Sequence, residues 1–192
     1  GLRHATAVSG YTVLMNYPRP VLGFAAFSGT GKTTLLKQLI PLLAERGVRV
    51  AVIKHAHHDF DIDKPGKDSH ELRKAGARQM LVASGRRWAL MTETEGDADP
   101  RLDSLIGHLD TEGIDLVLVE GFKHLPFPRI ELHRPSLGYS LLFPEDSNII
   151  AVATDEPVET GDLPRLDINN AAAIAEFILA WLEEQDDNAR KL

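Results

Sequence analysis

The stretch that decides the fold is residues 21–47, VLGFAAFSGTGKTTLLKQLIPLLAERG. Its first seven residues form an apolar run, which predicts a buried strand. The glycine-rich SGTGKT follows, and leucines then recur at helical spacing, at positions 35, 39 and 43. A second apolar run at 48–53 predicts another strand. Strand, helix and strand over this length form a βαβ unit, which predicts that the two strands are parallel.

The glycine-rich segment has the residue types that bind a triphosphate. It matches the pattern G-x-x-x-x-G-K-[ST] except at its first position, where Ala26 replaces glycine. Gly29 and Gly31 let the backbone curl so that N–H groups point at phosphate oxygens. Lys32 places a cation on the β- and γ-phosphates, and the Thr33 hydroxyl can ligate Mg²⁺. A plain glycine turn is the alternative, and the strand before it and the helix after it argue against that.

The rest of the chain continues the alternation of strands and helices. Apolar runs predict further strands at 79–83, 88–91, 114–119 and 148–153. Helical patterns predict helices at 69–75, 102–109 and 170–183, and the segment 121–129 is expected to be a loop. The alternation predicts an α/β protein with the three-layer P-loop fold and a mostly parallel central sheet. We expect one domain at 20–185, an N-terminal extension at 1–19 and a frayed tail at 186–192.

Composition excludes several classes of protein. Lys and Arg total 21 and Asp and Glu total 28, so the net charge is 21 − 28 = −7, which argues against general nucleic-acid binding. No apolar stretch approaches the roughly 18 residues of a membrane span, so no membrane partner is expected. The absence of cysteine excludes disulfides, thiolate zinc sites and iron–sulfur clusters. A cytoplasmic location is the expectation compatible with this composition.

Two acidic residues follow predicted strands and are candidates for nucleotide contacts. Glu120 closes IDLVLVE, and in a parallel sheet that end lies beside the phosphate loop. It could hold Mg²⁺ through water or orient the attacking water, or it could be a solvated strand end. Asp155 follows the strand at 148–153, and a carboxylate there can accept the N1–H and 2-amino group of guanine. The alternative for Asp155 is an ordinary turn residue.

A histidine-rich segment follows the second strand. Lys54, His55, His57, His58 and Asp59 stand close together in the sequence. Imidazole and carboxylate groups suit Zn²⁺ or Ni²⁺, so one interpretation is a metal site. A second is contact with an anionic substrate through the lysine and the histidines. A third is a polar surface loop.

Asp68 allows two interpretations as well. It could be a switch residue near the metal or the γ-phosphate, which would give it a catalytic role. It could instead cap the following helix, because Glu71 stands three residues on, as in a capping box. Both roles could hold together.

Four strings, AAFSGTGKTTLL, IKHAHHDFDIDKPGKDSHELRKAGA, RWALMTET and LVLVEGFKH, closely resemble the MobB family of molybdopterin-guanine dinucleotide biosynthesis proteins. The similarity runs from about residue 20 to about residue 185, and Ala26 matches the family. The resemblance implies a P-loop fold related to the metallochaperone GTPases, with GTP and Mg²⁺ as cofactors, weak GTPase activity and a homodimer. It also implies an accessory role in attaching GMP to molybdopterin, beside the guanylyltransferase MobA. By residue-level carry-over, phosphates would bind to Ser28, Gly29, Thr30, Gly31, Lys32, Thr33 and Thr34, with Thr33 on Mg²⁺ and Glu120 in the matching VEGF motif.

Four functions therefore compete. The first is a GTP-binding accessory protein that hydrolyses GTP slowly, because no arginine finger is evident. The second is a metal-insertion GTPase that loads nickel or zinc on the histidine cluster. The third is a small-molecule kinase, with Arg129 or Arg134 in a mobile lid. The fourth is a binding module that uses nucleotide only for stability.

Overall fold

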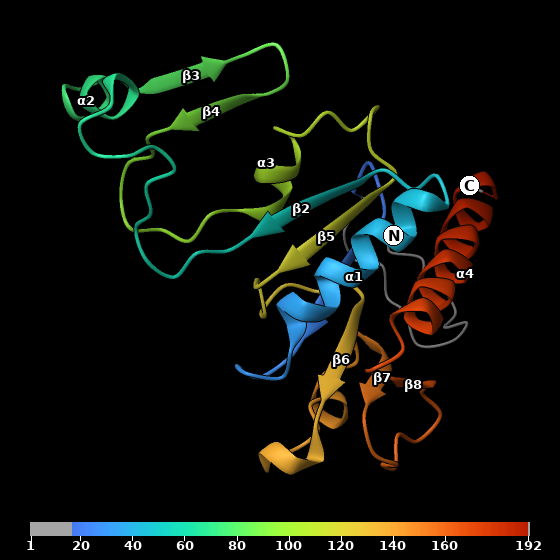
Figure 1. The fold of residues 1–192 in the computed structure, drawn as a ribbon. Helices are drawn as coiled ribbons and strands as arrows, with labels where there is room; N and C mark the ends of the chain where they lie inside the picture. The colour runs from blue at the N-terminus through green and yellow to red at the C-terminus, as the bar shows by residue number, and fades with distance from the viewer. Residues whose placement is uncertain (1–16, 192) are drawn as a thin grey trace, which may run out of the picture. The chain divides into compact units, whose positions relative to one another are not determined.

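A computed structural model describes residues 17–191, and the contacts within the chain divide it into two compact units (Figure 1). One unit contains the chain up to His55 and from Arg101 on, and the other contains Ala56–Pro100. Tyr17 packs on an apolar cluster of the first unit, and the Arg19 side chain donates a 2.6 Å hydrogen bond to the Thr111 carbonyl. Residues 17–19, assigned from the sequence to an extension, thus contact the fold. The rest of that extension lies outside the described residues.

The first unit is built on a six-stranded sheet in which every pairing is parallel. In spatial order its strands are β2 (Val50–Lys54), β5 (Leu116–Glu120), β1 (Val21–Ala25), β6 (Arg129–His133), β7 (Ile149–Thr154) and β8 (Arg165–Asp167). This confirms the α/β class with a mostly parallel central sheet. Because all strands run the same way, the segments that leave their carboxyl ends gather along one edge of the sheet.

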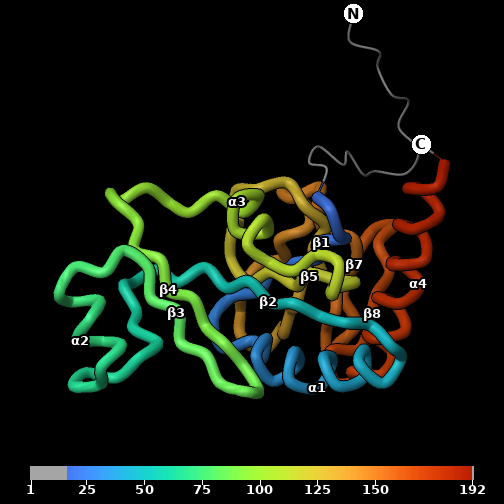
Figure 2. The backbone as a smooth tube through the Cα atoms, turned by 90° about the horizontal axis from the view of Figure 1, so that it is seen from above, coloured from blue at the N-terminus to red at the C-terminus, as the bar shows by residue number. Residues whose placement is uncertain are grey.

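Helices cover both faces of this sheet and complete the three layers. The helices of the first unit are α1 (Lys32–Glu45), α3 (Leu102–Ile106) and α4 (Ala171–Arg190). Apolar side chains of α1 and α4 share one buried cluster with β1, β5, β6 and β7, and those of α3 share another cluster with the opposite face. Figure 2 shows α3 and α1 on opposite sides of β1 and β5. The helix α4 continues to Arg190, past the predicted end at Glu183, so residues 186–190 are helical where the sequence predicts fraying.

The strand β6 is not predicted from the sequence, and it follows the segment predicted as a loop. Its sequence, RIELH, alternates polar and apolar residues, yet all five are buried. Arg129 donates to the carbonyls of Phe122 at 2.9 Å, Leu125 at 2.5 Å and Phe127 at 3.3 Å. Glu131 accepts two backbone N–H groups at 2.8 Å from residues 142 and 143, which are 11 and 12 residues further along the chain. Backbone groups of the segments before and after the strand satisfy the Arg129 and Glu131 side chains, which makes these side chains acceptable in a central strand. The strand β8 is also missed, because three residues carry no periodicity.

The second unit contains a short helix, α2 (Asp68–Lys74), and an antiparallel pair of strands, β3 (Gln79–Ala83) and β4 (Trp88–Thr92). Arg73 ties it together, since its guanidinium bonds Asp63 at 2.5 Å, Asp61 at 2.8 Å and Glu93 at 2.7 Å. These hydrogen bonds hold the pKa values of the Asp61 and Asp63 carboxyls below their usual range. Within residues 17–191 no helix is long and apolar enough to cross a membrane.

The arginine cluster predicts an acid-sensitive second unit. A carboxyl whose pKa is lowered by folding stabilises the fold above its unfolded pKa, near 4, and loses that contribution as the pH falls through the lowered value. We therefore expect amide protection in β3 and β4, measured by hydrogen exchange, to fall between pH 5 and pH 2. Arg73→Gln should lower protection already at pH 5 and flatten the pH dependence. An identical pH profile in the variant would show that Arg73 contributes nothing to it.

Candidate functional site

The phosphate loop connects β1 to α1 at the carboxyl edge of the sheet. Gly29 has φ of +82° and Gly31 has φ of +98°, values that favour glycine at both positions. Thr30, between them, is buried, and its hydroxyl donates a 2.7 Å hydrogen bond to the Phe27 carbonyl. Ser28 and Gly29 are exposed to solvent. The two glycines therefore have the positive φ of a curled backbone, and the Thr30 hydroxyl fixes the loop internally.

The start of α1 is suited to an anion. Gly31 is the N-cap residue, its position carries no side-chain cap, and the first turn contains no acidic residue. The first N–H groups of a helix have no intrahelical partner and carry partial positive charge. Lys32 is partly buried, and the hydroxyl-bearing Thr33 and Thr34 are exposed in the same turn. A phosphate with its Mg²⁺ thus fits the donors present, since cation, N–H groups and hydroxyls converge there.

The candidate acid Glu120 lies beside this loop. It ends β5, the neighbour of β1, and its Oε1 is 3.9 Å from Lys32 Nζ. The Glu120 side chain is only 14% exposed, so its charge is poorly screened by water. The structure therefore brings together the lysine and the carboxylate expected to handle the γ-phosphate and the metal.

Residues just after Glu120 pack against His55 beside the site, a contact that is not predicted from the sequence. Gly121 has φ of +93°, and a β-carbon there would lie 2.7 Å from the His55 β-carbon. Phe122 is the one non-glycine residue with positive φ in the described part of the chain, and its ring stacks on the His55 ring at 5.0 Å. The His55 amide donates to the Glu120 carbonyl at 2.9 Å. The Glu-Gly-Phe order is the available sequence signal, because only glycine fits so close an approach.

This close approach predicts a large difference between two glycine variants. Gly121→Ala should lower the free energy of unfolding by about 2 kcal/mol, since it combines backbone strain with a clash against His55. Gly138→Ala is a matched control, because Gly138 also has positive φ but meets no atom within 4 Å of an added β-carbon. We expect that control to lose about 1 kcal/mol from strain alone. Equal losses of unfolding free energy in the two variants, measured by thermal or denaturant unfolding, would show that the clash with His55 does not contribute.

The remaining histidine-segment residues are not assembled into a metal site. Lys54 is exposed at the end of β2, paired in register with Glu120. His57, His58 and Asp59 are exposed and belong to the second unit. Among residues 17–191, no group of three or more His, Cys, Asp or Glu side chains is placed to hold a metal ion. The described structure therefore gives no support to a zinc or nickel site, and the anion-contact role of these residues stays a prediction.

Asp68 does not cap the helix as predicted. The N-cap of α2 is Lys67, and Asp68 is the first helical residue. The Glu71 carboxylate accepts from the Gly66 amide at 3.2 Å. The capping-box interpretation is wrong because the helix begins one residue earlier than predicted, which leaves Asp68 inside the first turn. Its switch role is a prediction that concerns a residue of the second unit.

Asp155 lies at the same sheet edge, beside a hollow of about 360 Å³. The hollow is lined by residues from the end of β7, from all of β8 and from the loops after them: Thr154, Asp155, Glu156, Pro157, Arg165, Leu166, Asp167 and Asn169. Its carboxylates suit a ligand that donates N–H groups, as the guanine edge does. Because β6 alone separates β1 from β7, this hollow and the phosphate loop are near neighbours along the edge.

The two arginines considered for a kinase lid are both hydrogen-bonded to other residues of the first unit. Arg129 is buried in β6, where it bonds backbone carbonyls. Arg134 follows β6 and bonds the Thr30 carbonyl at 2.9 Å and Asp155 at 2.9 Å. Both side chains are hydrogen-bonded to residues of the first unit, so their positions give the kinase hypothesis no support.

Comparison with known proteins agrees with this geometry. The family model "Molybdopterin guanine dinucleotide synthesis protein B" (MobB) matches residues 21–155. The chain is 53% identical over 171 residues to the "Molybdopterin-guanine dinucleotide biosynthesis adapter protein" of Escherichia coli K12, covering 87% of this chain and 95% of that protein. The protein of the same name from Haemophilus influenzae is 48% identical, with 88% and 93% covered.

A solved structure supports the same relationship. The crystal structure of a molybdopterin-guanine biosynthesis protein B is 29% identical to this chain, with a TM-score of 0.66, and the similarity covers 85% of this chain and 99% of that one. The structure of Bacillus subtilis MobB, at 22% identity and a TM-score of 0.62, shares the fold. With the family match, the close relatives and the loop geometry all in agreement, the chain belongs to the MobB family.

Proposed function

We propose that this chain is a GTP-binding adapter protein in the synthesis of molybdopterin guanine dinucleotide. The observation that carries the proposal is the alignment of three groups along one sheet edge: the phosphate loop, Glu120 and Asp155. Relatives at 53% and 48% identity are named as adapter proteins of this synthesis. The metal-insertion alternative has no ligand cluster within the described residues, and the arginines considered for a kinase lid are hydrogen-bonded within the first unit.

The proposed roles follow from the positions of the side chains. The loop residues 28–34 bind the triphosphate through backbone N–H groups, Lys32 and hydroxyls. Thr33 and Glu120 would hold Mg²⁺, directly or through water, and the metal would neutralise phosphate charge. Hydrolysis should be slow, because the arginine beside the loop, Arg134, is bonded to the Thr30 carbonyl and to Asp155. Slow hydrolysis suits an adapter, because GTP then stays bound long enough for a partner to respond to it.

The partners are proposed from the family. We expect the chain to act beside the guanylyltransferase MobA and molybdopterin, and to be a homodimer. Exposed apolar side chains support self-association, since Leu81, Trp88 and Leu90 in the β3–β4 pair are 55%, 65% and 44% exposed. Trp88→Glu should then shift the sedimentation equilibrium toward monomer. A wild-type chain that is monomeric at high concentration would contradict the dimer.

The experiment that tests the proposed function is calorimetric titration of the wild-type chain with GTP and with ATP, each with Mg²⁺. We expect GTP to bind and ATP to bind far more weakly. Comparable binding of both nucleotides would overturn guanine recognition at Asp155. Failure of both to bind would overturn nucleotide binding by the isolated chain.

A further inference from the structure

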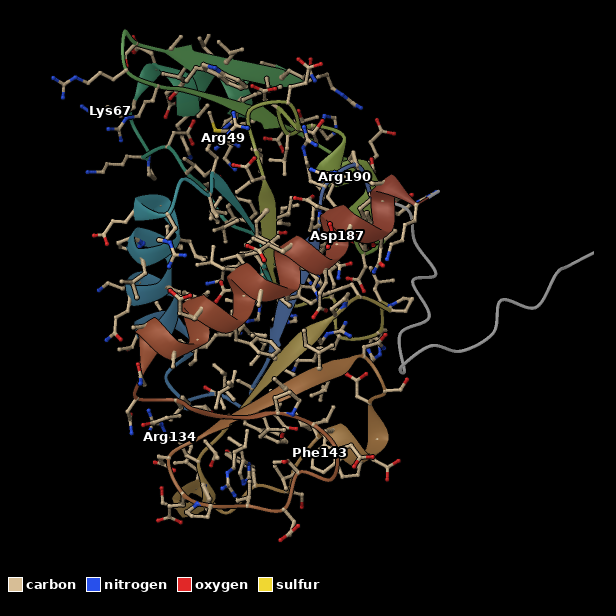
Figure 3. All side chains as sticks on the ribbon, turned by 90° about the vertical axis from the view of Figure 1, so that its right-hand side faces the viewer. Arg49, Lys67, Arg134, Phe143, Asp187 and Arg190 are labelled. Atoms are coloured by element: carbon tan, nitrogen blue, oxygen red, sulfur yellow. The ribbon has the colours of Figure 1, made fainter. Side chains whose placement is uncertain are left out.

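Arg134 stands where the sheet topology brings two parts of the proposed nucleotide site together. It is the first residue after β6, the strand between β1 and β7. The phosphate loop leaves β1, and Asp155 leaves β7 at a position adjacent to the end of β6, since His133 pairs with Thr154. Figure 3 shows Arg134 and Arg49 far apart. The Arg134 side chain can therefore reach both the phosphate loop and Asp155.

The guanidinium uses this position to bridge the two flanks. Nε donates to the Thr30 carbonyl at 2.9 Å, and Nη1 donates to Asp155 Oδ2 at 2.9 Å. Nη2 lies 3.4 Å from the Asn169 amide oxygen, another residue of the hollow. The planar fork of arginine fixes the directions of these donors relative to one another. Movement of one partner is thus passed to the others through a rigid group.

The bond to Thr30 has a direct consequence for phosphate binding. In a trans peptide the C=O of one residue and the N–H of the next point in opposite directions. Holding the Thr30 carbonyl toward Arg134 therefore directs the Gly31 N–H away from Arg134. Thr30 is also fixed by its own bonds to the Phe27 carbonyl, at 2.7 Å from the hydroxyl and 3.3 Å from the amide. Arg134 completes the restraint on the peptide that precedes α1.

We propose that Arg134 is a positioning residue that couples phosphate binding at the loop to base binding at Asp155. The inference rests on the proposed function and adds a specific link within it. Asp155 can serve both partners, because each carboxylate oxygen accepts more than one hydrogen bond. A guanine bound to Asp155 would hold Arg134 in place, and Arg134 in turn would hold the loop in its phosphate-binding form. The two halves of the nucleotide then bind cooperatively.

The test uses Mg²⁺ with inorganic triphosphate, a probe that lacks a base, beside Mg·GTP. Calorimetry compares the wild type with Arg134→Gln, Arg134→Lys and the control Arg49→Gln, whose arginine pairs with Asp115. We expect Arg134→Gln to weaken triphosphate binding about tenfold, and Arg49→Gln to change it less than twofold. Arg134→Lys keeps the charge but lacks the fork, so it should stay at least fivefold weaker than the wild type. If Arg134→Lys binds triphosphate as tightly as the wild type, the positive charge alone explains the affinity and the positioning role is overturned.

The affinity of Asp155→Ala for triphosphate is a second test, because the coupling and simple electrostatics predict changes of opposite sign. Removing a carboxylate should strengthen binding of an anion, whereas loss of the Arg134 anchor should weaken it. We expect triphosphate binding about threefold weaker in Asp155→Ala, and no further weakening when the change is made in Arg134→Gln. Unchanged or tighter binding in Asp155→Ala, or additive losses in the double variant, would overturn the coupling.

A readout without ligand separates this inference from the proposed function. If the wild type binds neither GTP nor triphosphate, the proposed function fails and Arg134 can still be tested. The Thr30 amide, hydrogen-bonded to Phe27, should exchange at least tenfold faster in Arg134→Gln than in the wild type or in Arg49→Gln. Equal exchange, in variants whose circular dichroism and unfolding midpoint match the wild type, would overturn the positioning role.

Discussion

Replacing Lys32 with alanine should lower the affinity for Mg·GTP about 100-fold. The ammonium group lies at the first turn of α1, 3.9 Å from Glu120 and 30% exposed, where a bound triphosphate would replace water around it. Removing the lysine from such a partly desolvated pair of ammonium and triphosphate costs about 3 kcal/mol of binding free energy, which corresponds to the expected 100-fold loss of affinity. Calorimetric titration of the variant with Mg·GTP measures it.

The matched control for Lys32 is Lys37, an exposed lysine on the same helix. Lys37→Ala changes the net charge by the same amount but should leave the affinity within twofold. The unfolding midpoint of Lys32→Ala has to be measured as well, because the variant leaves the Glu120 carboxylate without its cation. If a stable Lys32→Ala protein has an affinity for Mg·GTP within threefold of the wild type, the loop does not bind the triphosphate through Lys32.

Replacing Asp155 with asparagine should reverse the preference between guanine and xanthine nucleotides. In the proposed site, the carboxylate would accept N1–H and the 2-amino group of guanine, whereas xanthine has a carbonyl in place of that amino group. An asparagine amide can donate to this carbonyl but opposes the amino group of guanine. We expect Mg·GTP to bind about 100-fold more weakly, a loss of about 3 kcal/mol, and the xanthosine triphosphate complex to tighten. Asparagine keeps an oxygen for Arg134, so the bridge to the phosphate loop should persist.

Glu156→Gln is the control for this reversal, since Glu156 lines the same hollow and the change also removes one charge. It should leave the preference for guanine intact. Competition titrations with GTP, ATP and xanthosine triphosphate on each variant distinguish the cases. If Asp155→Asn retains the wild-type order of affinities, the base is read elsewhere.

Much of the fold was predictable from local sequence, and the exceptions share a cause. The strands β1, β5 and β7 are apolar apart from the polar residues that end β5 and β7, as strands buried on both faces require, and they were recognised. RIELH was not recognised as β6, because polar residues alternate with apolar ones although all five are buried, and backbone groups of the flanking segments satisfy Arg129 and Glu131. The end of α4 was placed too early for a related reason: its last residues are polar, and the helical pattern fades before the helix ends.

The candidate site divides in the same way. The phosphate loop and Glu120 were predicted from a motif and from a strand end, and the structure brings Lys32 and Glu120 together. The cap expected at Asp68 depended on a helix boundary, and a displacement by one residue removed it. The contribution of Arg134 was missed, since an arginine after a segment read as loop carries no signal of its own.

By itself, the sequence determined the α/β class, the phosphate loop and the membership of the MobB family, because these depend on residues that are neighbours along the chain. Only the tertiary structure decided the strand order β2-β5-β1-β6-β7-β8, and with it which residues meet at the carboxyl edge. That order places β6 between β1 and β7 and so delivers Arg134 to both Thr30 and Asp155, which are 104 and 21 residues away in sequence. The pairing of strands depends on burial and hydrogen bonding across the whole sheet, and no local pattern of residues contains it.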